Sequence, residues 1–542
     1  MSSLRGKITP EYRNPMNSQR RNFLKTTCLG GLGLSAGASA LKASESLPVN
    51  MRKSPAAETD PEMKSAPTGP VRNILWICTD QQRWDTLGVN GNPFVQTPHL
   101  DQLADEGVLF ERAYCNNPVC MPSRSSFLTG LYPTATGVPF NGYNYPDELL
   151  PHLLTHRLNT HGYNCGLAGK LHIRADVRNK AYPESGYHHG YDEFSWSPCG
   201  FPVRWAGCQY QHWLKDKGIM PDVRNHPDSK HVQLNVSPEH HQTSWCAQRA
   251  ITFMQAMAEV QPNQPWMFSC NMFDPHNPTD PPAEMLERYY DLLDDIPLPN
   301  YEEGELENKP EWQREHHANA NKRMPPHALR FDDLSEHEHK LYRAGYYAMI
   351  DLIDQQVGRI LKALEETGQR ENTLVIFTSD HGESLGDHGL YWKQYWCYEE
   401  SMRVPLIMSW PGMKPQGRRV SNFAELVDIV PTIYDAIGIR KPDWLHGHSW
   451  WPYLNGGNPV ERDFAYAELN AWNQTDVSMV RTEDFKLVKD YASGEGELYD
   501  YRDPHLERVN HFTEAAYQET RSSLEVKMNQ RRQAIRGTSL PA

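Results

Sequence analysis

The stretch NILWICTDQ, residues 73–81, sets the expectation for the fold. Its first seven residues form an apolar run with two isoleucines, a leucine and a tryptophan. Such a run is typical of a strand that is buried on both faces. Two polar residues, Asp80 and Gln81, follow it directly. Strands of this kind are characteristic of α/β proteins, in which helices cover both faces of a mostly parallel sheet.

The rest of the chain alternates between helix-like and strand-like patterns. Helix-like segments that lead into strand-like runs lie at residues 97–114, 150–169, 244–273 and 335–379. In the last of these, Tyr346, Ile350, Ile353 and Val357 recur at spacings of three or four, and the strand-like TLVIFTS follows at 373–379. We therefore predict an α/β fold with a large, mostly parallel mixed sheet sandwiched by helices.

Composition divides the chain into four segments. We assign residues 1–43 to a signal peptide, 44–70 to a linker, 71–460 to a large domain and 461–542 to a C-terminal subdomain. The last segment has short strand-like runs separated by turn signals, then a helix at about 512–533, which predicts a small antiparallel sheet with a helix. Within the large domain, the polar stretches 173–242 and 274–334 are expected to be insertions above the sheet.

The N-terminal segment has the features of an export signal. Arg20 and Arg21 form a pair, and a weakly apolar stretch at 29–41 follows, too short and too rich in Gly and Ala to span a bilayer. We interpret this segment as a twin-arginine signal, cleaved near Ala40 or Ala43, which implies a bacterial periplasmic or secreted protein, the twin-arginine translocase as a partner, and no stable membrane span. The alternative is a disordered basic tail.

The net charge limits the classes of partner. The 542 residues carry a formal charge of -14, which argues against nucleic-acid binding because a basic surface is expected there. The charge says little about a small anionic substrate, which responds to local fields. The 15 Trp and 26 Tyr are expected mostly in the core, with stacking platforms for sugar rings as the alternative.

Polar residues that follow two buried strands indicate a metal site. Asp80 and Gln81 follow the strand at 73–79, and Asp380 and His381 follow the strand-like TLVIFTS. Ligands of open α/β sheets bind beyond the carboxyl ends of the strands. Oxygen donors suit calcium or magnesium, whereas ligation by His381 would shift the preference toward manganese or iron. The alternative is that each Asp caps the element that follows it.

A cysteine precedes a helix-like run in NNPVCMPSRSSFLTG, residues 116–130. Pro122 suits the first turn of a helix, so Cys120 is expected near a helix N-terminus, where anions bind. Arg124, one turn further, could hold an oxyanion or steady the group at position 120. From the residues alone, Cys120 is either a thiolate nucleophile or a buried structural cysteine.

The motif C-x-P-S-R followed by SSFLTGLYP resembles the signature of the type I sulfatases in the alkaline phosphatase superfamily. Other stretches that resemble family blocks, in family order, are DQQRWDTLG (80–88), TPHLDQLADEGVLFERAY (97–114), GLAGKLH (166–172), GYDEF (190–194), FDPHNP (273–278), TSDHGESLGDHG (378–389), EESMRVPLI (399–407) and GELYDYRDP (496–504). The resemblance covers about residues 72–510 and implies an alkaline-phosphatase-like fold.

The resemblance implies a modified nucleophile at position 120. In the family this Cys is oxidised by a separate formylglycine-generating enzyme. One hydroxyl of the aldehyde hydrate attacks sulfur and expels the alcohol, and the other then loses its proton and ejects sulfate. One divalent metal is implied, calcium by family habit with manganese as the alternative. Its expected ligands are Asp80, Gln81, the matured Cys120, Asp380 and His381.

The resemblance also implies roles for five further side chains. Arg124 matches the residue that steadies the formylglycine, and Lys170 and His172 match the pair beside the nucleophile and sulfate. His276 and Lys393 match the pair near the leaving oxygen, where they would protonate it or neutralise its charge.

The expected metal set departs from that of many sulfatases. It is Asp/Gln plus Asp/His, where many members have Asp/Asp plus Asp/Asn, and it is closer to choline-sulfatase-like enzymes and phosphonate monoester hydrolases. We therefore predict hydrolysis of an organic sulfate ester, with a sulfated sugar as the favoured substrate. A phosphonate monoester or phosphodiester hydrolase is the first alternative. An inactive glycan-binding protein on a sulfatase scaffold is the alternative from another class.

Overall fold

The computed structural model describes residues 67–174, 184, 188–200, 207–318, 329–393, 396–470, 475–538 and 540. The predicted signal peptide, with Arg20 and Arg21, and nearly all of the predicted linker lie outside the described residues. Within the described ranges, every helix is too short or too polar to cross a membrane.

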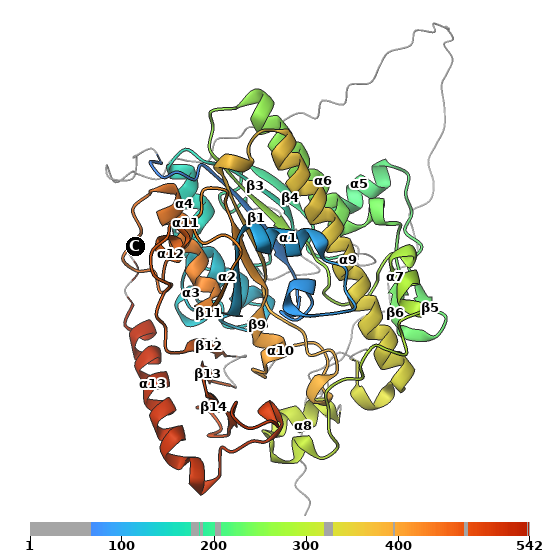
Figure 1. The fold of residues 1–542 in the computed structure, drawn as a ribbon, viewed down its shortest axis with the longest axis vertical. Coiled ribbons are helices and arrows are strands. Elements are labelled where there is room, and N and C mark those ends of the chain that lie inside the picture. Colours follow the sequence, from blue (N-terminus) through green and yellow to red (C-terminus); the bar gives the residue numbers. More distant parts are fainter. Residues whose placement is uncertain are drawn as a thin grey trace, which may run out of the picture. The chain divides into compact units, whose positions relative to one another are not determined.

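A large mixed sheet forms the centre of the fold (Figure 1). In spatial order its strands are β11 (Arg418–Glu425), β2 (Val108–Tyr114), β10 (Leu406–Ser409), β8 (Thr373–Ser379), β1 (Asn73–Thr79), β7 (Trp266–Asn271), β3 (Asn164–Gly169) and β4 (Glu193–Trp196), and β9 (Arg403–Val404) pairs with β2. From β8 to β4 every neighbouring pair is parallel, whereas β10 runs antiparallel to β8 and β2. The predicted mostly parallel mixed sheet is confirmed.

Helices cover the sheet in two layers (Figure 1). One layer contains α1 (Pro98–Glu106), α6 (Gln242–Val260) and α9 (Glu336–Glu366), with α9 packed against both of the others. The other layer contains α2 (Cys120–Thr129), α4 (Leu154–Thr160) and α11 (Ile429–Ile437). The shorter helices are α3 (Pro133–Thr136), α5 (Gln209–Asp216), α7 (Ala283–Tyr290), α8 (Glu311–His317), α10 (Glu399–Met402) and α12 (Trp451–Leu454). The predicted long helix is α9, whose start is fixed by a capping box between Ser335 and Glu338.

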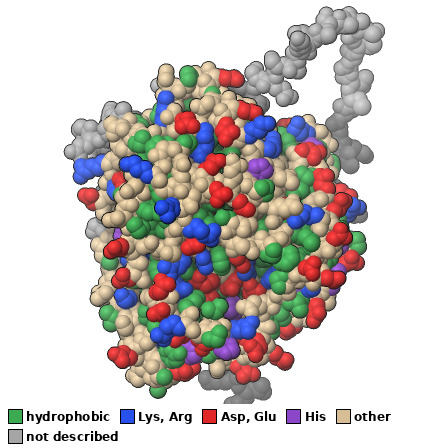
Figure 2. Space-filling model, in the orientation of Figure 1, with side chains coloured by type: hydrophobic (Ala, Val, Ile, Leu, Met, Phe, Trp, Pro, Cys, Tyr) green, Lys and Arg blue, Asp and Glu red, His purple; other side chains and the backbone are tan. Residues whose placement is uncertain are grey.

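The C-terminal residues form the predicted small subdomain. Its antiparallel sheet contains β12 (Ala465–Leu469), β13 (Val477–Arg481), β14 (Phe485–Asp490) and β15 (Gly496–Asp500), and α13 (Gln518–Arg536) closes it. On the face shown in Figure 2, acidic and basic side chains are intermingled, as expected for a chain of moderate negative charge.

The stretch 173–242, expected to be an insertion above the sheet, also contributes to the sheet itself. Its strand β4 pairs in parallel with β3 and extends the edge. Only four residues pair, and polar flanking residues hide so short a strand in the sequence. A separate hairpin of β5 (Arg224–His226) and β6 (Ser229–Leu234) accounts for another part of this stretch.

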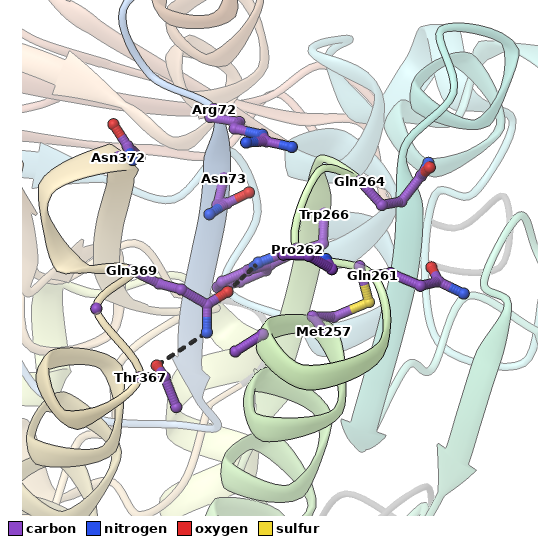
Figure 3. A pocket seen from close by; sticks show the side chains of 12 residues that line it. Arg72, Asn73, Met257, Gln261, Pro262, Gln264, Trp266, Thr367, Gln369 and Asn372 are labelled. Atoms are coloured by element: carbon purple, nitrogen blue, oxygen red, sulfur yellow. Dashed lines mark hydrogen bonds between the residues drawn. The ribbon is translucent and has the colours of Figure 1, made fainter.

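The two ends of the central strands differ in character. A cavity of about 210 Å³ lies at the amino ends of β1, β7 and β8, where Trp266 donates a hydrogen bond to Gln369 (Figure 3). Its lining is mostly uncharged, with Arg72 at one side. The carboxyl ends of the same strands carry the buried ionisable groups that were predicted to form a site.

Candidate active site

Strand pairing brings Asp80 and Asp380 together. Thr79 and Ser379 are partners in the parallel register of β1 and β8, so the residue after each strand emerges at the same edge of the sheet. His381 lies beside them, with its Nε2 3.8 Å from Oδ1 of Asp80 and 3.6 Å from Oδ1 of Asp380. All three side chains are fully buried.

Arg124 lies between these two carboxylates. Its Nη2 is 3.1 Å from Oδ2 of Asp80 and its Nε is 2.8 Å from Oδ2 of Asp380. A third donor, Nη1, bonds the backbone carbonyl of Lys170 at 2.8 Å. The guanidinium is fully buried, and burial opposes its charge. The two carboxylates outweigh this effect and raise the pKa of Arg124 above its usual range. Arg124 therefore holds the edge of the sheet together rather than reaching solvent.

Cys120 is the first residue of α2, as predicted. Its Sγ is 3.1 Å from Nε2 of His381, 3.7 Å from Oδ1 of Asp80 and 3.6 Å from Nζ of Lys170. Burial opposes ionisation of the thiol, but the charges of Lys170, Lys393 and His381 outweigh it and lower the pKa of Cys120 well below its usual range. The site thus favours an anionic group at position 120.

Lys170 is held beside Cys120 by the end of β3. Its Nζ lies 2.5 Å from Oδ2 of Asp80. Gly169, just before it, has φ of 104°, and a Cβ there would lie 1.8 Å from the backbone oxygen of Asn271. Only glycine fits this close approach, which turns the chain so that Lys170 enters the site. Two residues further on, half-buried His172 lies near Cys120 and also lowers the pKa of its thiol.

His276 approaches the same cluster from the loop after β7. Its Nε2 is 4.0 Å from Oδ1 of Asp80, and its Nδ1 donates to the carbonyl of Asn277 at 2.6 Å. Burial lowers the pKa of His276, and the nearby charge of Lys393 lowers it further. In the resting site Nε2 is therefore unprotonated and available to accept a proton.

Lys393 reaches the cluster through Gln81. Its Nζ donates to the side-chain oxygen of Gln81, and the side-chain nitrogen of Gln81 donates to Glu383. All of the residues predicted for the site (Asp80, Gln81, Cys120, Arg124, Lys170, His172, His276, Asp380, His381 and Lys393) thus fall within one network of contacts at one edge of the sheet.

Sequence reasoning missed Glu383. Its carboxylate also accepts hydrogen bonds from the backbone N–H groups of Leu385, at 3.0 Å, and Trp392, at 2.5 Å. It therefore fixes both Gln81 and the loop that leads to Lys393. Its place three residues after Asp380, inside the block TSDHGESLGDHG, was the available signal. The sequence alone does not show which way its side chain turns.

The donor set fits a divalent cation. One ligand atom from each of Asp80, Cys120, Asp380 and His381 lies within 4.8 Å of all the others, and each residue is buried. The carboxylates and the imidazole are ligand types that suit such an ion. The side-chain oxygen of Gln81, the remaining expected ligand, faces Lys393 in this structure.

Comparison with known proteins identifies the family. A family model described as "Sulfatase" matches residues 72–439, and one described as "N-sulphoglucosamine sulphohydrolase, C-terminal" matches residues 386–534. The chain belongs to the sulfatase family. It is a sulfuric ester hydrolase by family, and the predicted resemblance is confirmed.

This sulfatase is similar to characterised members and to solved structures. It is 30% identical to an arylsulfatase of Clostridium perfringens, over 82% of this chain and 91% of that one. It is 25% identical to an N-acetylglucosamine-6-O-sulfatase of Bacteroides thetaiotaomicron, over 83% and 84%. Among solved structures, a phosphonate monoester hydrolase from Silicibacter pomeroyi is 26% identical with a TM-score of 0.73, over 85% and 95%.

Replacing Arg124 in this sulfatase should lower the free energy of unfolding of the protein. In Arg124→Ala, two buried carboxylates lose their shared cation, and breaking a buried pair in this way costs about 3–5 kcal/mol. Arg124→Lys should recover only part of this, because one ammonium cannot bridge both carboxylates. The free energy of unfolding from urea titration measures the effect. As a control, Lys362→Ala removes the exposed pair with Glu366 and should cost less than about 1 kcal/mol. Equal losses in Arg124→Ala and Lys362→Ala would contradict this account.

Proposed function

We propose that this protein hydrolyses a sulfate ester, on a sulfated carbohydrate, with a formylglycine hydrate made from Cys120 as the nucleophile. The observation that carries the proposal is the position of Cys120. Cys120 is the first residue of α2, and its side chain is surrounded by Lys170, His381 and the carboxylate of Asp80. In the matured enzyme, hydroxyl oxygens would replace Sγ in these surroundings.

The charges around position 120 support attack on an anionic ester. Lys170 is within reach of both the nucleophile and Asp80, so its ammonium can neutralise a sulfate oxygen while the carboxylate orients it. His381 Nε2, 3.1 Å from Sγ, lies where it can contact a hydroxyl of the hydrate. His172 is a further polar side chain near this nucleophile.

Asp80, Asp380 and His381 are the residues that would hold the divalent metal, together with Gln81 if Lys393 moves off its amide oxygen. When bound, the metal would lower the pKa of a nucleophilic hydroxyl and polarise the ester. We favour calcium from the carboxylates, with manganese as the alternative that the imidazole supports.

Two side chains are placed to act on the leaving alcohol. His276 Nε2 lies 4.0 Å from Oδ1 of Asp80, and the Lys393 ammonium donates to Gln81, so both groups belong to the network around the nucleophile. Because the resting His276 is unprotonated at Nε2, we assign the proton to Lys393 or to a His276 that gains it as substrate binds.

The proposal that the substrate is a carbohydrate rests on similarity to other sulfatases and on the expected export. One relative is named as an N-acetylglucosamine-6-O-sulfatase. We also propose that the N-terminal segment directs the chain through the twin-arginine translocase to the periplasm or the exterior. A formylglycine-generating enzyme would modify Cys120 before this export. The divisions at residues 43, 70 and 460 belong to the same proposal.

A phosphonate monoester hydrolase is the second candidate. It is favoured by the similarity to the Silicibacter pomeroyi enzyme and by the Asp/Gln plus Asp/His set. The same nucleophile and cations could act on phosphorus. The third candidate, an inactive glycan-binding protein, is disfavoured because the nucleophile and all of the expected metal ligands are present in this chain.

Rates on matched aryl esters decide between these candidates. Purified protein with matured Cys120 is assayed on an aryl sulfate and on the corresponding aryl phosphonate monoester. We expect kcat/KM to be at least about tenfold higher for the sulfate, a difference of about 1.4 kcal/mol in transition-state binding. Cys120→Ala should abolish turnover of both while keeping the circular dichroism spectrum. A preference for the phosphonate would establish the second candidate, and turnover of neither ester would revive the binding protein.

His276→Ala should show whether this histidine acts on the leaving group. An activated aryl sulfate needs little help from an acid, whereas an alkyl or sugar sulfate has a poor leaving alcohol. We therefore expect kcat to fall about 10²–10⁴-fold on the poor leaving group and far less on the aryl ester. His99→Ala, at a half-exposed histidine on α1 paired with Asp354, is the matched control. Equal losses on both esters would remove His276 from this role.

A further inference from the structure

A second cluster of buried ligating side chains lies next to the candidate active site. It consists of His241, Asp274 and Asp280, with one ligand atom of each within 4.8 Å of the others. Each of the three residues is at most 2% exposed. The mechanism proposed above uses none of them.

Three different segments supply the cluster. His241 is the residue before the first turn of α6, and Asp274 lies on the loop after β7. Asp280 follows Thr279, which pairs with Val232 of β6. Side-chain donors hold both carboxylates in place: Thr243 donates to Oδ2 of Asp274 at 2.6 Å, and Asn235 donates to Oδ2 of Asp280 at 2.6 Å.

His241 has no hydrogen-bond partner in these surroundings. Neither Nδ1 nor Nε2 of the buried ring makes a hydrogen bond among the described residues. Nδ1 lies 3.2 Å from Oδ2 of Asp274, but the pair lacks hydrogen-bond geometry. A buried imidazole with unused nitrogens is unusual, because burying a polar group without a partner costs free energy.

The two carboxylates of the cluster are also short of cationic partners. Within the described part of the chain, neither Asp274 nor Asp280 forms an ion pair with a Lys or Arg. A protonated His241 lies 3.2 Å from Asp274 and can offset that charge, whereas burial raises the pKa of Asp280 well above its usual range. A divalent cation would cancel both and would also take up a free nitrogen of the ring. Two carboxylates and an imidazole are ligands suited to manganese or zinc more than to calcium.

We propose that His241, Asp274 and Asp280 bind a second divalent transition-metal ion, separate from the ion at Asp80 and Asp380. This site ties the N-terminus of α6 to the loop that carries His276, which is two residues after Asp274. The backbone oxygen of Asp274 accepts a hydrogen bond from the N–H of Asp80 at 3.1 Å, so the second ion also braces the edge of the catalytic site.

Counting metal ions per chain tests this inference without an activity assay. The full chain is dialysed against metal-free buffer, and its metals are measured by inductively coupled plasma mass spectrometry. We expect two divalent ions in the wild type, one in Asp280→Asn, one in Asp380→Asn, and none in the double variant. Circular dichroism confirms folding, and Asp228→Asn, an exposed acid on the β5–β6 turn, is the control that should keep both ions.

Each result decides the question. An ion that remains in Asp380→Asn and is lost when Asp280 is also replaced supports the second site. Asp380→Asn protein without any ion would overturn it and would leave His241 as an internal imidazolium. If Asp280→Asn fails to fold, the Asp380→Asn variant alone still decides the question, because an ion that it retains must be bound outside the catalytic site. The comparison is also independent of the substrate, so a phosphonate hydrolase would give the same counts.

Discussion

The site depends on one buried cation, the guanidinium of Arg124. Two parallel strands end side by side, and each delivers an aspartate to the same edge of the sheet. Without a cation, Asp80 and Asp380 would repel each other in a low-dielectric interior. Arg124 reaches both from the first turns of α2 and uses its third donor for the carbonyl of Lys170. The helix that carries Cys120 is thereby locked to the strands that carry the expected metal ligands.

The other side chains of the active site are likewise held in place by neighbouring residues. Gly169 turns the end of β3 so that Lys170 contacts both Asp80 and Cys120. Glu383 holds Gln81 and the backbone that leads to Lys393. Each of these side chains is oriented by a partner, which is what preorganised electrostatic catalysis requires. The same preorganised set can serve sulfur or phosphorus esters, so selectivity must come from groups that touch the rest of the substrate.

Much of this could be predicted from local sequence. The strands at 73–79 and 373–379 end where predicted, because an apolar run followed by Asp is a local signal. The position of Cys120 at a helix N-terminus also followed from its neighbours. In contrast, β4 was hidden in a polar stretch, and the direction of Glu383 depends on contacts with residues far along the chain. The cluster of His241, Asp274 and Asp280 joins three segments through tertiary packing alone, so its sequence carries no spacing signal.

The central claim is that Cys120 is a precursor of the nucleophile. The most direct measurement is the mass of the peptide that contains residue 120, from active protein made in its native host. Conversion of the thiol to the aldehyde lowers the mass by about 18 Da, a change distinct from the oxygen additions of cysteine oxidation. This account predicts that mass in protein that hydrolyses sulfate esters. An unmodified thiol in active protein would contradict it.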